Sequence, residues 1–264
     1  VWADKNLAGT RALLPGSVGQ WANAFADVEQ FAGGSWSIAT NRSQQNANAA
    51  ILFGSGGTAE EDARLSLVWL KAFGVGAVGV SGRESKEFWK PFAHPEKFAG
   101  VLPALWSEDG VTIYRVPSRS PSLAHVVPEG AIVRHAPVDG KDSAEASRYV
   151  AALEDALLPT ADFAWRGRNQ IRIRTTASRG QAVSVQVGYH HGWHATVGGQ
   201  ARRVYKDGLG LMWLRPECAG PCEIAMDYDG GWELKLCRAV SYLAITGVLV
   251  VPVVLAVRRR RART

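Results

Sequence analysis

The strongest constraint on this chain is an uncharged apolar segment near its C-terminus, which runs from Ala239 to Val257 and reads AVSYLAITGVLVVPVVLAV. An α-helix of about 20 apolar residues is long enough to cross the hydrocarbon core of a bilayer, and a membrane helix tolerates a single proline such as Pro252. Length alone leaves a buried core helix as the alternative. We predict a transmembrane helix over residues 239–257.

A run of arginines follows this segment at once and decides between the two interpretations. Positively charged residues beside a membrane helix lie on its cytoplasmic side, so the run predicts a basic cytoplasmic tail over residues 258–264. An isolated arginine cluster can also bind nucleic acid, but the net charge of +6 comes mostly from this tail and suggests no nucleic-acid partner. The arginines are Arg258, Arg259, Arg260, Arg261 and Arg263.

This orientation places everything before Ala239 outside the cytoplasm. A large domain reaches that side only behind a signal peptide or an earlier membrane helix. The chain opens with neither a charged n-region nor an apolar h-region. We therefore expect an additional N-terminal portion with other membrane helices.

The periodicity of apolar residues predicts an α+β fold whose first region, residues 1–120, mixes helices and strands. Helices are expected over Asn41–Phe53, Ala59–Phe73 and Glu84–Phe92, and a buried strand over Val75–Gly82. Val111–Val116, Leu123–Pro128 and Ala131–Pro137 read as further strands, and Ser143–Asp155 reads as a helix.

Beyond Pro159 the chain consists of short apolar runs separated by Gly, Asn and Ser turns. In NQIRIRTTA, Ile171 and Ile173 alternate with Arg172 and Arg174, as in a strand with one buried face. A Gly-Gly pair in HATVGGQARR is a hairpin signal. Strands at this spacing predict a β-sandwich or jelly-roll-like domain over residues 121–235.

Two of the three cysteines lie close together. Cys218 and Cys222 flank the turn sequence Ala-Gly-Pro, and on the oxidising side of a membrane a disulfide is expected there. A structural zinc site needs four ligands, of which this pair supplies two. Cys237 lies at the predicted membrane boundary and is expected to be unpaired.

Candidate chemistry is sparse. His190, His191 and His194 form an H-H-x-x-H pattern, but no helix aligns their side chains, so we expect a polar turn and no metal or cofactor. Asp227-x-Asp229 precedes two glycines and reads as solvated turn carboxylates. The aromatic stretch around Tyr189, Trp193 and His194 can stack on a sugar or pack into the core; these three residues are the ligand candidates.

The segment QVGYHHGWHATVGGQARRVYKDGLGLMWLRP resembles the C-terminal domain of YfhO-type bacterial membrane proteins. Their pattern of a strand, a turn with Tyr before Gly-Trp, and a Gly hairpin is matched by Tyr189, Gly192, Trp193, Ala195, Val197 and Gly199. His191 stands where a proline is common. Leu67–Gly82 and Val111–Pro128 resemble earlier segments of the same family, so the resemblance covers roughly residues 60–258.

The resemblance implies a place in the bacterial cytoplasmic membrane. The family is similar to multi-pass glycosyltransferases of the GT-C class, which use lipid-linked sugar donors and keep the catalytic carboxylate in an early external loop. That region is absent from this sequence, so no catalytic residue transfers to it.

Two functions follow as hypotheses. The first is the extracytoplasmic domain of a membrane glycosyltransferase-like protein in envelope glycan modification, with glycan or lipid-linked sugar and the upstream helices as partners. The second is a non-catalytic glycan-binding or assembly module anchored by one helix. Further membrane helices upstream favour the first hypothesis, and a lone signal anchor favours the second.

Overall fold

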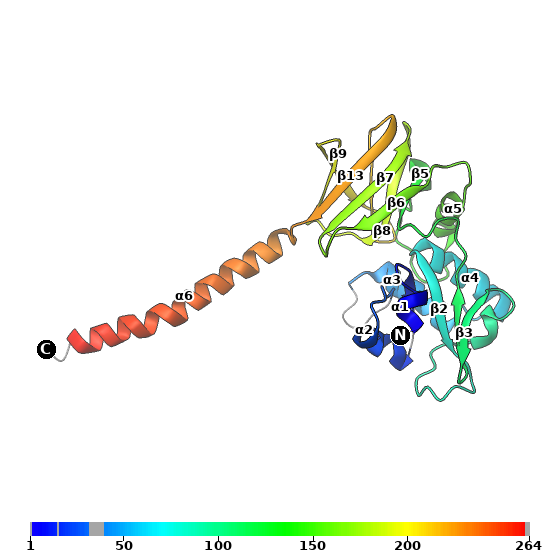
Figure 1. Ribbon diagram of the computed structural model, residues 1–264, viewed down its shortest axis with the longest axis horizontal. Helices are drawn as coiled ribbons and strands as arrows, with labels where there is room; N and C mark the ends of the chain where they lie inside the picture. Colours follow the sequence, from blue (N-terminus) through cyan, green and yellow to red (C-terminus); the bar gives the residue numbers. More distant parts are fainter. Residues whose placement is uncertain (1, 15, 32–39, 262–264) are drawn as a thin grey trace.

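A computed structural model describes residues 2–14, 16–31 and 40–261 of the chain and shows an α+β fold with one long C-terminal helix. Figure 1 shows two folded parts stacked on each other and the helix α6 extending away from them. We call residues 2–116 the N-terminal region and residues 124–228 the sandwich.

The N-terminal region is built on a four-stranded sheet of order β1-β2-β4-β3. Its strands are β1 (Arg11–Leu13), β2 (Val75–Ser81), β3 (Ala104–Glu108) and β4 (Val111–Arg115). β1 pairs with β2 in parallel, and the other pairs are antiparallel. The helices are α1 (Trp2–Asn6), α2 (Gly16–Phe25), α3 (Arg42–Phe53), α4 (Ala59–Ala72) and the 3₁₀ turn η2 (Pro95–Phe98).

Helices cover both faces of β2, and this is why its sequence is almost uniformly apolar. Ala77 packs into a cluster with residues of α1 and α2. Val78 and Val80 face the opposite way, into a larger core that includes Trp69 of α4 and Ile51 of α3. The expected helix over Ala59–Phe73 and the expected strand over Val75–Gly82 are both confirmed.

The second part is a sandwich of two sheets, with strand orders β10-β9-β13-β7-β6 and β11-β12-β8-β5. The strands of the first sheet are β6 (Ala161–Trp165), β7 (Gln170–Ala177), β9 (Trp193–Val197), β10 (Gln200–Arg202) and β13 (Gly220–Tyr228). Those of the second are β5 (Ala124–Pro128), β8 (Gln181–Gly188), β11 (Val204–Lys206) and β12 (Leu211–Leu214).

The inner faces of the two sheets enclose one apolar cluster. Ile171 and Ile173 of β7 are fully buried in it, together with Val183 and Val185 of β8. The alternation predicted for β7 is therefore confirmed. The expected Gly-Gly hairpin is present as well, since β9 pairs with β10 around Gly198 and Gly199.

The two parts share a core. α5 (Ala144–Leu153) lies between α4 and β5. Its Tyr149 is fully buried, and the hydroxyl lies 2.8 Å from Ser184 Oγ on the outer face of β8. The larger cluster continues through α5 to Trp213 of β12. The N-terminal region and the sandwich therefore pack as one body.

Two expected elements are wrong. Residues Glu84–Phe92 form an irregular segment with no helix, because Pro91 disfavours helical backbone at the residue before it and Ser85 Oγ accepts the N–H of Glu87 in a local turn.

Residues Ala131–Pro137 form no strand; the 3₁₀ turn η3 (Glu129–Ala131) opens an irregular segment there. The backbone N–H groups of Arg134 and His135 donate to the Glu145 carboxylate, at 2.6 and 3.2 Å, instead of to a neighbouring strand.

The C-terminal helix α6 (Gly231–Arg261) begins eight residues before the predicted start. The sandwich therefore ends at Tyr228 and not at residue 235. Gly231–Pro252 is the one described helix long and apolar enough to cross a membrane, and the apolar stretch within it is not buried in the protein. Cys237 lies exposed on it as a free thiol. Arg261 ends α6, whereas Arg263 and the side chains of Arg258, Arg259 and Arg260 lie outside the described residues.

Candidate functional sites

The aromatic residues expected to bind a ligand close the end of the sandwich from which α6 leaves. Trp193 begins β9 and pairs in register with Tyr228, the last residue of β13. Its ring centroid lies 5.2 Å from that of Tyr228 and 6.3 Å from that of Trp165. Trp193 and Tyr189 are partly buried against the sandwich core. Protein therefore covers part of both side chains.

His194 does not join them. Successive side chains of a strand point to opposite faces, and His194 is exposed while Trp193 and Ala195 face the core. Its Nε2 lies 3.5 Å from Asp229 Oδ1. The structure thus brings Tyr189 and Trp193 to the same end of the sandwich but directs His194 to the other face of its sheet.

Asp229 holds the first turn of α6 to the sandwich. Its carboxylate accepts from Lys235 Nζ and from the backbone N–H of Gly231, both at 2.8 Å. Lys235, followed by the Gly231 N–H, holds the pKa of Asp229 well below its usual value. Asp227 instead accepts from Gln170 Nε2 at 2.7 Å. The two carboxylates of the Asp-x-Asp pair therefore serve separate structural contacts.

The turn between β8 and β9 reaches the same helix. His191 Nε2 lies 2.7 Å from Glu233 Oε2, and the His190 and His191 rings stack with centroids 4.2 Å apart. His190, His191 and Glu233 offer ligand atoms within 4.8 Å of one another. However, His190 Nδ1 accepts the N–H of Gly192 at 3.1 Å. That nitrogen therefore already serves the turn between β8 and β9.

A cleft of about 350 Å³ opens between the N-terminal region and the sandwich. Arg11 on its wall donates to the carbonyls of Phe73 and Gln186, both at 2.6 Å, and ties the two parts together. Gln186 in turn donates to the Lys71 carbonyl at 2.8 Å. His125 Nε2 lies 3.2 Å from Gln186 Oε1, and burial lowers the pKa of this histidine.

The rim of the cleft is polar and carries both a positive and a negative side chain. Lys71 Nζ lies 3.2 Å from Glu154 Oε2. The serine-rich loop between β4 and β5 completes the lining with Ser118, Ser120 and Ser122. Sequence reasoning missed this site, because its residues come from five separated segments. The composition of the loop, PSRSPS, was the only local signal.

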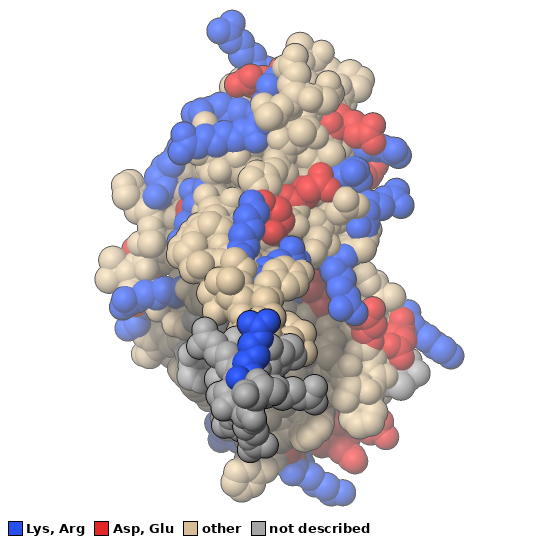
Figure 2. Space-filling model, turned by 90° about the vertical axis from the view of Figure 1, so that its left-hand side faces the viewer, with Lys and Arg blue, Asp and Glu red and all other residues tan. Residues whose placement is uncertain are grey.

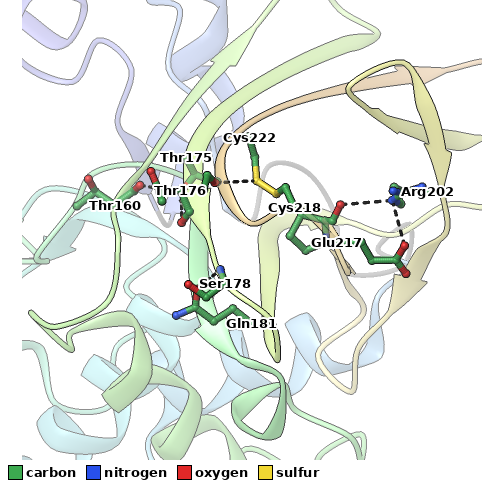
Figure 3. The surroundings of a disulfide bond; sticks show 11 residues. Thr160, Thr175, Thr176, Ser178, Gln181, Arg202, Glu217, Cys218 and Cys222 are labelled. Carbon is green, nitrogen blue, oxygen red and sulfur yellow. Dashed lines mark hydrogen bonds and ion pairs between the residues drawn. A yellow bond between two sulfur atoms is a disulfide. The ribbon is translucent and has the colours of Figure 1, made fainter.

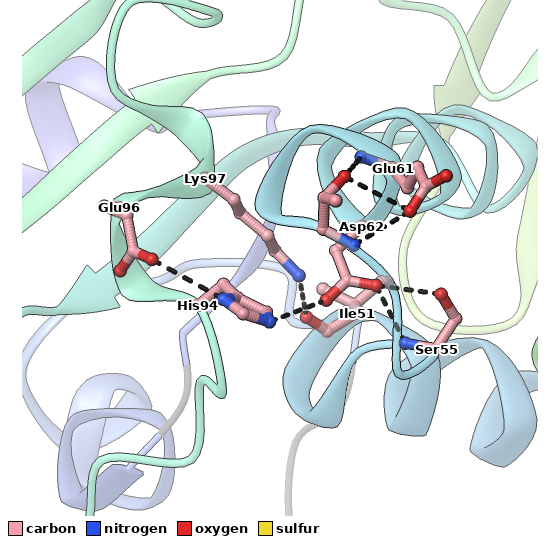
Figure 4. A network of polar contacts seen from close by, with 8 residues as sticks. Ile51, Ser55, Glu61, Asp62, His94, Glu96 and Lys97 are labelled. Carbon is pink, nitrogen blue, oxygen red and sulfur yellow. Dashed lines mark hydrogen bonds and ion pairs between the residues drawn. The ribbon is translucent and has the colours of Figure 1, made fainter.

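A second polar network is buried under α3 and α4 (Figure 4). Asp62 is fully buried and accepts from Ser55 N and Oγ, at 2.8 and 2.9 Å, while His94 Nε2 lies 3.4 Å from its Oδ2. Lys97, only 4% exposed, donates to the Ile51 carbonyl at 2.5 Å, and burial lowers its pKa to about 8.

This network caps a helix, since Ile51 lies in the last turn of α3, where a cation is favoured. The first turn of α4 is acidic, with Glu60, Glu61 and Asp62. Glu61 does sit there, in a capping box with Thr58, but Asp62 points inward and joins His94.

The Cys218–Cys222 disulfide lies at the start of β13, at the opposite end of the strand from α6 (Figure 3). The Cα atoms are 6.2 Å apart. Cys222 is buried opposite Thr175 of β7. Beside it, Arg202 Nε donates to the Pro216 carbonyl at 3.3 Å and pairs with Glu217 at 3.5 Å.

No protein-family model, curated protein or solved structure matches this chain, so the resemblance to YfhO-type proteins remains a prediction.

Proposed function

We propose that this chain is a membrane-anchored extracytoplasmic domain of a glycosyltransferase-like protein that acts on envelope glycans. In this proposal the chain binds or positions glycan and supplies no catalytic residue. The observation that carries the proposal is α6, a helix whose apolar stretch is not buried in the protein and which leaves the end of a folded α+β body without a flexible linker.

The contacts at the junction support an anchoring role. Asp229 directly follows the sandwich, and His191 lies in its β8–β9 turn; each contacts the first two turns of α6, through Lys235 and Glu233. Only Gly230 separates Asp229 from the helix start. Such a connection would hold the body at a defined height and orientation above the bilayer, as a domain serving a membrane enzyme requires.

We place glycan binding in the cleft between the two parts. Sugars are bound through hydroxyl groups, and the cleft presents serine hydroxyls, Lys71 and Glu154 around an open volume. Tyr189 and Trp193, the earlier candidates, pack against the sandwich core, so they support the fold of this end more directly than a ligand.

The cleft proposal is tested by filling the cleft. Ser118→Trp places an indole at its rim, and Ser178→Trp on an exposed turn before β8 is the matched control. We expect binding of envelope oligosaccharide by the detergent-solubilised chain, measured by calorimetry, to be lost in the first variant only. Equal binding in both variants, or no binding by the wild type, contradicts the proposal.

The membrane topology is tested separately with a reporter fused after Thr264. We expect the reporter to lie in the cytoplasm, and we expect neutral replacements of the tail arginines to weaken that retention. An external reporter on the wild type overturns the orientation.

The absence of catalysis is tested with the purified chain and a lipid-linked sugar. Glycosyl transfer requires an acid or base positioned beside the reacting carbon. Turnover by the chain alone would refute the non-catalytic assignment.

The alternative is a glycan-binding or assembly module that is anchored by this helix and serves no transferase. Its fold and cleft would be the same. The reading frame upstream of Val1 separates the two: several membrane helices with an acidic external loop favour the transferase, and a single signal segment favours the module.

A further inference from the structure

The helix α2 exposes large aromatic side chains that the fold does not use. Trp21 is 64% exposed and Phe25 is 71% exposed. Residues four apart lie on one face of a helix, so both rings project from the same side. α2 carries no charged residue along its whole length. An uncharged helix with an exposed aromatic face is unusual on a surface that meets only water.

A second segment extends this face. Ser17, one turn before Trp21, donates to Glu87 Oε1 at 2.6 Å. A side chain at Gly16 would meet the Trp89 carbonyl oxygen at 2.9 Å, which shows how closely the segment approaches the helix start. Phe88 is 99% exposed and Trp89 is 42% exposed. We call Trp21, Phe25, Phe88 and Trp89 the aromatic patch.

Charge around the patch favours an anionic surface. Lys86 and Lys90 are exposed and bracket Phe88 and Trp89 in the sequence K-E-F-W-K. Glu87, between them, is held by Ser17. Basic residues on either side of exposed aromatic rings are typical of segments that lie in the headgroup region of a membrane.

The position of α2 relates the patch to the candidate membrane span. Figure 1 shows α2 on the side of the N-terminal region toward which α6 extends. Figure 2 views the molecule from that side, with Lys and Arg side chains at several points of its outline. Trp232, 62% exposed, begins α6 itself.

We propose that the aromatic patch rests in the interface of the same bilayer that α6 crosses. Trp and Tyr are enriched at membrane interfaces because their rings combine apolar faces with a polar group. The patch would insert its rings at the boundary of headgroups and acyl chains, while Lys86 and Lys90 contact anionic headgroups. The body would then have two membrane contacts, α6 and the patch. This proposal rests on α6 spanning the membrane.

The test measures the depth of single labelled sites in the full chain. The chain carries Cys237→Ser, keeps the Cys218–Cys222 disulfide, and is reconstituted in vesicles of phosphatidylcholine and phosphatidylglycerol. An environment-sensitive fluorophore is attached at Phe25→Cys. Quenching is measured with a phosphatidylcholine that bears a nitroxide near the top of its acyl chain.

Two control sites make the result decisive. Leu243→Cys lies within the candidate span, and Leu157→Cys is a 92% exposed site just after α5, which Figure 1 shows on the side away from α6. We expect quenching at residue 25 to be several-fold greater than at residue 157 and comparable with that at residue 243. In Lys86→Gln with Lys90→Gln, quenching at residue 25 should decrease in phosphatidylglycerol vesicles.

The other outcomes overturn the proposal in distinguishable ways. Quenching at residue 243 but not at residue 25 leaves α6 as a membrane span and refutes the patch. Absence of quenching at both sites refutes the span and the patch together. A label at residue 25 that neither the lipid nitroxide nor aqueous iodide reaches is covered by protein, and the patch is then a protein contact.

Discussion

The two ends of the sandwich are held by different means. At the start of β13, the Cys218–Cys222 disulfide closes the strand covalently beside the Arg202–Glu217 pair. At the end of the same strand, next to α6, Trp193 and Tyr228 pack together, and Asp229 binds Lys235 through a salt bridge. No described residue makes a covalent cross-link at that end.

The two ends should therefore respond differently to mutation and to pH. A disulfide acts mainly by restricting the unfolded chain, so it stabilises the far end whatever the pH. Packing and ion pairs act in the folded state and respond to side-chain loss and to titration. The junction with α6 is therefore the end at which mutation and pH change the structure most.

The largest expected effect comes from removing the aromatic closure of the α6 end. Trp193→Ala should lower the free energy of unfolding by about 3 kcal/mol, near the lower limit for a buried tryptophan, because the ring is only partly buried. Urea unfolding in detergent measures this. Trp232→Ala, exposed on α6, should change it by no more than about 0.5 kcal/mol.

The comparison of these two variants also decides the role of the ring. If Trp193→Ala abolishes glycan binding and leaves stability unchanged, this end of the sandwich is a ligand surface and our assignment of the ring to packing is wrong.

The next effect is at the far end. Replacing both cysteines, Cys218→Ser with Cys222→Ser, should lower the free energy of unfolding by about 2 kcal/mol. The effect is this small because a disulfide that closes a short loop restricts the unfolded chain only a little. Thermal unfolding under non-reducing conditions measures it. Mass spectrometry of non-reduced peptides from exported protein should show the linked pair. Two alkylatable thiols after export would mean that the far end has no covalent closure in the cell.

The third expected effect, smaller than the first two, is a dependence of folding stability on pH. Asp207, in the turn before β12, accepts the Leu211 N–H at 2.7 Å, and burial raises its pKa to about 7. Between its usual value near 4 and about 7, the folded state keeps a proton that the unfolded chain has lost. Stability should therefore fall as pH rises through this window.

Asp207→Asn removes that dependence. The loss of stability between pH 5 and pH 8 should be smaller in the variant than in the wild type by at least about 1 kcal/mol. Asp155→Asn, at an exposed position, is the control. Parallel pH curves for wild type and Asp207→Asn would show that the carboxyl is ionised in the folded protein at neutral pH.

The smallest expected effect is at the Asp229 ion pair, which is exposed to solvent. The lowered pKa of Asp229 means that its contribution is present above about pH 4 and is lost as pH falls below that value. Lys235→Met removes the main cause, so acid unfolding should begin at a higher pH. The shift should disappear at high salt. A salt-independent shift would point to lost packing by the lysine stem.

The spacing of apolar residues was sufficient to predict an element that buries one regular face. The 3.6-residue spacing of α4 and the alternation of Ile171 and Ile173 each follow from a single element facing a single core. The same holds for the C-terminal helix, although its start could not be placed: charged Glu233, Lys235 and Arg238 end the apolar run, but the backbone stays helical back to Gly231.

The spacing of apolar residues gave wrong or no predictions where hydrogen-bond partners come from another segment of the chain. Ile132 and Val133 read as strand residues and are buried, but Glu145 takes the neighbouring N–H groups that a strand would have used. The His94 partner of the buried Asp62 and the Gln186 partner of Arg11 could not be predicted from local spacing, since each pair joins residues far apart in sequence.

By itself the sequence determined most of the regular elements it was used to predict, the disulfide candidates and the apolar terminal helix, because each depends on residues within a few positions of one another. Only the tertiary structure decided which side chains meet. It turned His194 away from Trp193, directed Asp62 inward, and placed the aromatic face of α2 on the side from which α6 leaves. Burial and hydrogen bonding between separated segments set those positions, and no local spacing encodes them.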